Sequence, residues 1–241
     1  MVKNTMNKLT TILLDLDGTL LPMDQNMFIK LYFKELVTHF IPYGFSQETM
    51  IEGVNEGTKA MSINDGSVTN EERFWSVFAK HLGPEIRNIE PEFEKFYLNE
   101  FNKVKASTTT NPITALLIQT LKDKGLEIVI ATNPLFPKVA THARIKWAGF
   151  SPEDAAYITT YETCTFCKPN LNYYREILQK VGKDPSECMM VGNDVSEDMI
   201  VDGLGMKRYL ITDCLINHNN DDISKIPNGS LKDFLKFVES L

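Results

Sequence analysis

The sequence predicts an α/β fold, with a doubly wound Rossmann-like core, a mainly parallel sheet and a small α-helical domain. Three short runs are apolar on both faces, which is typical of strands buried in a parallel sheet. Segments with helical spacing separate them, and the stretch 22–105 contains no convincing strand. In such a fold, ligands bind beyond the carboxyl ends of the strands.

The first strand is expected at residues 10–15, where an apolar run ends in an Asp-Gly-Thr turn. Two further apolar runs predict strands at 127–131 and 188–191, and weaker ones lie at 156–159 and 208–211. Helical spacing predicts helices at 112–124, 137–148, 172–181 and 196–204, and a closing helix at 230–241 that Ser230 caps.

The stretch between the first strand and residue 106 is expected to form a second domain. Amphipathic patterns predict helices within it, for example at 28–40 and 71–82, with a loop at 62–67. We therefore predict a core of residues 1–21 and 106–241 and a helical domain of residues 22–105. The alternative is that these helices belong to the outer layer of the core.

The amino-acid composition argues against nucleic acid and membranes as partners of this protein. The formal net charge is −7 and no lysine or arginine run would track a phosphate backbone, so nucleic acid is not an expected partner. No stretch approaches the roughly 20 apolar residues that cross a bilayer, and the start lacks the apolar region of a signal peptide. Four cysteines in a chain of 241 residues do not indicate a disulfide framework, and the expected location is cytoplasmic.

The strongest chemical signal is Asp15-Leu-Asp17-Gly-Thr. Two carboxylates directly after a buried strand crowd negative charge, which is costly unless a cation or a proton is shared. Oxygen ligands of this kind favour Mg²⁺. The plain alternative is a strand that ends in a turn rich in Asp and Gly.

Three weaker signals lie farther along the chain. Thr132 and Asn133 could bind phosphate oxygens through a hydroxyl and free backbone N–H groups, although Thr-Asn is also an ordinary helix-capping pair. Lys168 offers a positive charge, although a lone lysine is usually a solvated surface group. Asp194 and Asp198 would share a face at a helix start, which is unfavourable unless they serve a metal or a basic partner.

Together these four motifs resemble the haloacid dehalogenase superfamily of hydrolases, in the family's order and from residue 10 to about residue 204. The resemblance implies a Rossmann-like core, dependence on Mg²⁺ and an aspartyl-phosphate intermediate. The stretch 22–105 looks like the family's helical cap domain.

The resemblance also implies roles for single residues. Asp15 would be the nucleophile, and Asp17 would protonate the leaving alcohol and then deprotonate the hydrolytic water. Thr132, Asn133 and Lys168 would bind the transferring phosphoryl group.

The metal ligands implied are the Asp15 carboxylate, the Asp17 backbone carbonyl and Asp194. Many members carry an acid directly after the glycine of the last motif, where this chain has Asn193, so Asp194 would take that role one residue later. Asn193 and Asp198 are expected around the ligands, with Asp198 orienting Lys168 or a water on the metal.

The predicted function is a phosphatase of a small phosphorylated metabolite, acting as a monomer or homodimer. Asp17 favours phosphoester chemistry because a true dehalogenase has no leaving alcohol to protonate. A phosphomutase acting on a sugar phosphate and a catalytically silent binding protein remain alternatives; the Asp-x-Asp start and the helical insertion disfavour a receiver domain. Phe74, Trp75 and Phe78 are interpreted as the core of the helical domain, and Cys164 and Cys167 as small buried side chains.

Overall fold

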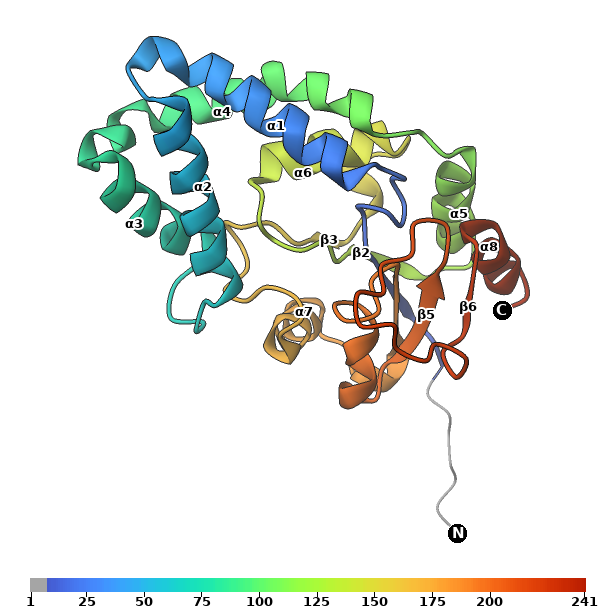
Figure 1. Ribbon diagram of the computed structural model, residues 1–241. Helices are drawn as coiled ribbons and strands as arrows, with labels where there is room; N and C mark the ends of the chain where they lie inside the picture. Colours follow the sequence, from blue (N-terminus) through green and yellow to red (C-terminus); the bar gives the residue numbers. More distant parts are fainter. Residues whose placement is uncertain (1–7) are drawn as a thin grey trace.

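The computed structural model describes residues 8–241 and contains one six-stranded sheet in which every strand pair is parallel (Figure 1). The strand order is β3-β2-β1-β4-β5-β6, the order of a Rossmann fold. The strands are β1 (Thr11–Leu14), β2 (Glu127–Ile130), β3 (Tyr157–Ile158), β4 (Cys188–Gly192), β5 (Lys207–Ile211) and β6 (Asn228–Gly229). The predicted fold class is confirmed, while the two-residue strand β6 was not predicted.

The first seven residues lie outside the described part of the chain. The prediction that they belong to the core, and the expectation that no signal peptide begins there, therefore fall partly outside the structure. Within residues 8–241, no helix has both the length and the apolar composition that crossing a membrane requires.

Both faces of the sheet are buried, as the apolar strand runs predict. Along β1, Ile12 and Leu14 belong to one hydrophobic cluster and Leu13 belongs to another, because successive side chains point to opposite faces. Helices α5 (Pro112–Asp123), α6 (Lys138–Trp147) and α8 (Leu231–Glu239) contribute to the first cluster. Helix α7 (Leu171–Val181) contributes to the second. Ser230 caps α8 by accepting the backbone N–H of Asp233, as expected.

The α-helix expected at 196–204 was wrong. A turn follows β4, and only a short 3₁₀ helix, η6 (Met199–Leu204), forms after it. Asp194 Oδ1 accepts the backbone N–H groups of Ser196 and Glu197 at 2.8 and 2.9 Å, a local side-chain bond that competes with helix formation. Asp194 and Asp198 consequently do not project from one face of a regular helix.

Four α-helices and three 3₁₀ helices lie between β1 and α5, and we call residues 22–105 the helical insertion. Figure 1 shows its α-helices grouped to one side of the sheet. The elements are α1 (Gln25–Phe40), η1 (Ile41–Tyr43), α2 (Gln47–Ser62), α3 (Asn70–Leu82), η2 (Pro84–Ile89), α4 (Glu90–Leu98) and η3 (Glu100–Ser107). Helices are present at both segments predicted from amphipathic patterns.

The chain enters and leaves the insertion through two adjacent segments. The backbone N–H of Asp24 donates to the carbonyl of Ser107 at 3.0 Å, and that of Thr109 donates to Pro22 at 2.9 Å. These two hydrogen bonds hold the entering and leaving segments side by side, and the division into residues 1–21 with 106–241 and residues 22–105 stays a prediction.

The insertion also packs against the core through aromatic side chains. The rings of Phe28 and Phe136 are 5.9 Å apart, and those of Phe101 and Trp147 are 5.2 Å apart. One continuous hydrophobic cluster therefore includes side chains of the insertion and of the sheet. Aromatic packing of this kind adds to the stabilisation that burial alone provides.

Candidate active site

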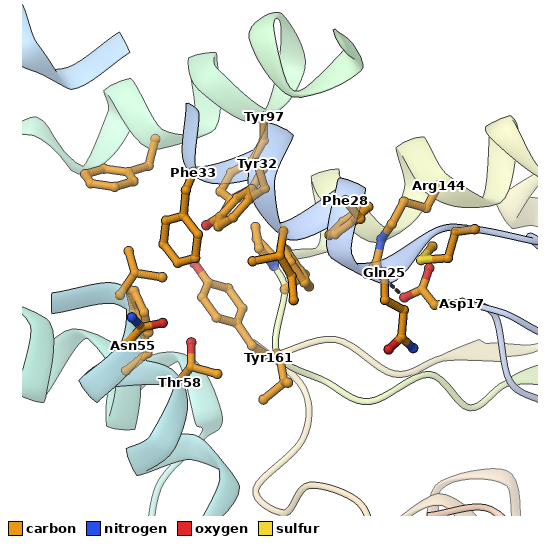
Figure 2. Close-up of a pocket in the computed structure, with 18 of the residues that line it drawn as sticks. Asp17, Gln25, Phe28, Tyr32, Phe33, Asn55, Thr58, Tyr97, Arg144 and Tyr161 are labelled. Carbon is orange, nitrogen blue, oxygen red and sulfur yellow. Dashed lines mark hydrogen bonds and ion pairs between the residues drawn. The ribbon is translucent and has the colours of Figure 1, made fainter. Parts of the chain in front are cut away.

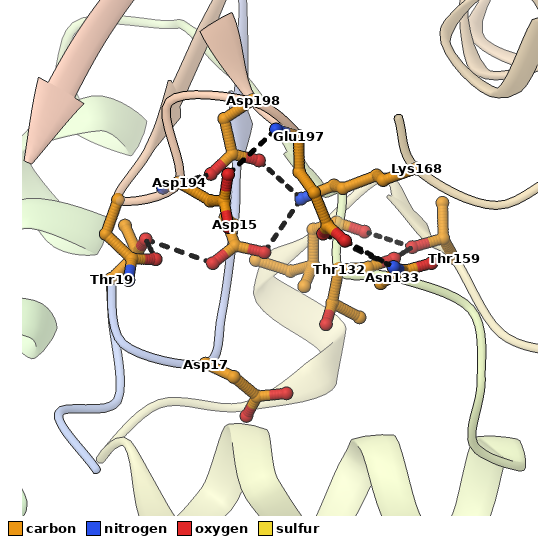
Figure 3. Close-up of polar contacts among 12 residues, drawn as sticks. Asp15, Asp17, Thr19, Thr132, Asn133, Thr159, Lys168, Asp194, Glu197 and Asp198 are labelled. Carbon is orange, nitrogen blue, oxygen red and sulfur yellow. Dashed lines mark hydrogen bonds and ion pairs between the residues drawn. The ribbon is translucent and has the colours of Figure 1, made fainter. Parts of the chain in front are cut away.

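Asp15, Lys168 and Asp198 form a buried ion-pair cluster at the carboxyl end of the sheet (Figure 3). Lys168 Nζ donates to Asp15 Oδ1 at 2.8 Å and to Asp198 Oδ1 at 2.6 Å. The Lys168 side chain is 1% exposed. The structure thus brings together three residues that lie far apart in the sequence.

Electrostatics favour the charged form of Lys168 despite its burial. Burial opposes the positive charge of Lys168, but the two carboxylates hold the pKa of Lys168 well above its usual value. Burial raises the pKa of Asp198, and the charge of Lys168 opposes that rise. Lys168 is therefore a fixed cation beside Asp15.

The turn after β1 lies in close contact with the loop after β4. Gly18 has φ +84°, and a Cβ there would collide with the side chain of Asn193. The Thr19 hydroxyl lies 3.0 Å from Asp15 Oδ2 and 2.9 Å from Asn193 Oδ1 and donates to these acceptors. Asn193 Nδ2 donates to the carbonyl of Cys214 at 2.6 Å. Asn193 thus joins three loops at this edge of the sheet.

The loop after β4 also depends on a glycine. A Cβ at Gly192 would overlap the carboxylate of Asp198, so the glycine leaves room for that side chain. Asp198 Oδ2 accepts the backbone N–H of Asp194 at 3.0 Å, while its other oxygen faces Lys168. Asp198 therefore both closes the turn and positions the lysine.

Thr132 and Asn133 lie directly after β2, next to this cluster (Figure 3). The Thr132 carbonyl accepts the hydroxyls of Thr159 and Tyr173 at 2.6 and 2.9 Å, which fixes the backbone at this point. The Asn133 side-chain amide donates to the Glu197 carboxylate at 3.2 Å, and Asn133 Oδ1 is buried without a partner. Burial raises the pKa of Glu197. Glu197 was not predicted as a site residue, because only the turn after β4 brings it next to Asn133.

Asp17 is directed away from the Asp15 cluster and toward helix α6 (Figure 3). There it forms an ion pair with Arg144, which is 1% exposed and lies 4.6 Å from the ring centroid of Phe136. Burial raises the pKa of Asp17, the charge of Arg144 opposes that rise, and the charge of Asp15 adds to it. Arg144 was not predicted as a site residue, since a lone arginine in a helical pattern does not indicate its partner.

A cavity of about 370 Å³ adjoins Asp17 and Arg144, between the helical insertion and the core (Figure 2). Nine of the residues that line it are aromatic. Phe74 and Trp75 belong to this lining, whereas Phe78 is fully buried, so the predicted aromatic core of the insertion also borders the cavity.

The donor atoms near Asp15 suit a hard divalent cation. Asp15 follows β1, and Asp194 follows the neighbouring strand β4. The backbone carbonyl of Asp17 lies two residues after Asp15. Within residues 8–241, there is no group of three or more His, Cys, Asp or Glu side chains that could hold a metal ion. The expected ligands are two carboxylates and one backbone carbonyl, so they do not form such a group. Oxygen ligands alone are typical of Mg²⁺ sites, which rarely rely on protein ligands only.

Fold and site together define an α/β enzyme whose acidic and basic groups converge at the carboxyl edge of a parallel sheet. Residues 9–200 match the haloacid dehalogenase-like hydrolase family, and the chain belongs to it. The predicted family is confirmed.

Relatives agree with this assignment. The chain is 26% identical to glyceraldehyde 3-phosphate phosphatase of Methanothermobacter thermautotrophicus over 222 residues, which is 90% of this chain and 92% of the relative. A haloacid dehalogenase-like phosphatase from Thermococcus onnurineus has a similar fold, with a TM-score of 0.59 and 19% identity over 95% of this chain and 98% of the other. A 2-haloacid dehalogenase from Pseudomonas syringae superposes with a TM-score of 0.64 and 15% identity, covering 96% and 98%. The expectation of a phosphatase of the haloacid dehalogenase type is confirmed.

Proposed function

We propose that the protein is a Mg²⁺-dependent phosphatase that hydrolyses a small phosphorylated metabolite through an aspartyl-phosphate on Asp15. The observation that carries the proposal is the buried Asp15 carboxylate, held by Lys168 and Thr19, with a second acid two residues away. A dehalogenase would not need that second acid, because its leaving halide takes no proton. The phosphatase named among the relatives points in the same direction.

In the first step, an oxygen of Asp15 attacks phosphorus and the bond from phosphorus to the leaving oxygen breaks. Asp17 gives its proton to that leaving oxygen, and an alcohol departs. Lys168 and the Thr132 hydroxyl would contact the phosphoryl oxygens and stabilise their growing charge, with Asn133 beside them.

In the second step, water attacks the phosphorus of the aspartyl-phosphate. Asp17, now a carboxylate, takes a proton from that water. The bond between phosphorus and Asp15 breaks, so inorganic phosphate leaves and both acids return to their starting states. Burial raises the pKa of Asp17, the direction that an acid in the first step requires, and the charge of Arg144 opposes that rise.

Mg²⁺, when bound, would neutralise negative charge shared by Asp15 and the phosphoryl oxygens. The Asp15 carboxylate, the Asp17 carbonyl and Asp194 would hold it. The chain's net charge of −7 makes such local positive charge necessary for an anionic substrate. The helical insertion would act as the cap that excludes water during the first step.

The experiment is release of inorganic phosphate from a panel of phosphorylated metabolites, with Mg²⁺ or with EDTA. We expect release that EDTA abolishes and that added Mg²⁺ restores. Release that is equal in both conditions would contradict the metal assignment, and no release from any ester would contradict the phosphatase assignment.

A further inference from the structure

The cavity beside Asp17 lies where the leaving group of a substrate would sit. Asp17 is expected to protonate the leaving oxygen, so the alcohol must extend from the phosphoryl group past this residue. Figure 2 shows Asp17 and Arg144 at one end of the cavity and Tyr32, Phe33 and Tyr161 farther along it. Its volume of about 370 Å³ lies within the usual range for small-molecule pockets.

The lining of this cavity is largely aromatic and apolar. Helix α1 supplies Phe28, Tyr32 and Phe33, helix α3 supplies Phe74, and the core supplies Phe136. Such flat walls favour ring-shaped apolar groups, which gain from burial and from edge or stacking contacts.

The residues that line the cavity carry one ion pair. Among its lining residues only Asp17 and Arg144 are ionic, and they pair with each other. The hydroxyls of Tyr32 and Tyr97 hydrogen-bond each other at 3.0 Å, so they are partly satisfied without a ligand. Arg144 is the only cation among the lining residues, so a second phosphate or a carboxylate on the leaving group would have to compete with Asp17 for it, and burying that anion would be costly.

We infer that the substrate is a phosphate monoester whose alcohol carries an uncharged, largely apolar aromatic ring. This inference rests on the proposed function, because it places the leaving group next to Asp17. The ring would lie between α1 and α3 of the insertion and Phe136 of the core. Asn55 and Thr58, on α2, would offer the few polar contacts.

The test compares benzyl phosphate with ethyl phosphate, two esters of alcohols with similar acidity that differ in the ring. Since one methylene in an apolar pocket is worth about tenfold or more in kcat/KM, we expect benzyl phosphate to be preferred by at least about tenfold. Binding of the non-hydrolysable benzylphosphonate and ethylphosphonate, followed by calorimetry, should show the same order.

A cavity-filling variant tests whether the preference for benzyl phosphate arises in this cavity. Thr58→Trp places a large ring in the cavity and should lower the benzyl-to-ethyl preference about tenfold or more, by the same reasoning in reverse. Thr38→Trp, at an exposed position on α1 away from the cavity lining, is the matched control and should keep the wild-type preference.

The outcomes separate this inference from the proposed function. Hydrolysis of both esters with no benzyl preference, or a preference unchanged in Thr58→Trp, would overturn the aromatic leaving group and leave the phosphatase standing. Tighter binding of benzylphosphonate without hydrolysis of any ester would support the pocket and overturn the phosphatase.

Discussion

At the scale of single residues, Lys168 determines whether the buried acids are tolerated. It pairs with both Asp15 and Asp198, and all three side chains are at least nine-tenths buried. Removing one partner of a buried pair leaves an uncompensated charge, so Lys168→Met should lower the free energy of unfolding by about 3–5 kcal/mol. Urea unfolding measures this loss, and the added change Asp198→Asn should restore part of it.

Lys122→Met is the matched control for that substitution. Lys122 pairs with Asp154 at the surface and its side chain is 45% exposed, so its loss should cost about 1 kcal/mol or less. Equal stability of wild type and Lys168→Met would show that the cluster is not the ion pair described here.

Asp17 should matter most when the leaving alcohol is a poor one. General acid catalysis contributes about 10²–10⁴-fold, so Asp17→Asn should lower kcat/KM for benzyl phosphate by that order. The loss should be smaller for p-nitrophenyl phosphate, whose leaving group needs no proton. Because kcat/KM reports the first chemical step, equal losses for the two esters would argue against an acid role for Asp17.

At the scale of elements, the start of helix α3 joins the insertion to the loop before Lys168. The backbone N–H of Asn70 donates to the Cys164 carbonyl at 2.8 Å. Its buried side-chain amide lies 3.3 Å from the Phe166 carbonyl and 3.4 Å from the Pro134 carbonyl and donates to both. This contact lies far along the chain from the paired segments that enter and leave the insertion.

Substituting Asn70 tests that contact. Asn70→Ala leaves buried carbonyls without a donor, which should cost about 1–3 kcal/mol in the free energy of unfolding. Asn102→Ala, at an exposed position whose amide bonds only nearby carbonyls, should cost clearly less. Similar losses in the two variants would mean that the Asn70 side chain does not hold the insertion to the core.

The elements that the sequence predicted correctly are those with strong local patterns. The apolar runs gave five strands, and the helical spacing gave the helices around them, because local periodicity and burial agree there. The segment 196–204 was wrong because Asp194 bonds the next backbone N–H groups, a local competition that spacing does not reveal. Strand β6 has only two residues and offers no pattern.

The candidate site was predicted unevenly for a similar reason. Asp15, Lys168 and Asp198 could be placed together because the resemblance to the family assigned them to one site, and two ion pairs join them. Arg144 could not, since it lies on the inner side of a helix and its partner is 127 positions away in the chain. The aromatic cavity depends on how the insertion packs on the core, which no short segment encodes.

At the scale of the whole molecule, the shared hydrophobic cluster predicts that the insertion and the core unfold together. The fluorescence of the chain's two tryptophans can follow the two parts separately, since Trp75 lies in the insertion and Trp147 lies on α6 of the core. In Trp75→Phe and Trp147→Phe, the remaining tryptophan fluorescence and the far-ultraviolet circular dichroism should give one midpoint in urea. Midpoints that differ between the two probes in either variant would show that the insertion unfolds independently.

The proposed mechanism depends above all on Asp15 as the nucleophile, and trapping the covalent intermediate tests it most directly. The enzyme is mixed with Mg²⁺ and a hydrolysed ester, quenched in acid and digested, and the peptide that carries residue 15 is examined by mass spectrometry. We predict one added phosphoryl group on Asp15, with no label and no turnover in Asp15→Asn. A label on another residue, or near-normal phosphate release by Asp15→Asn, would contradict the mechanism.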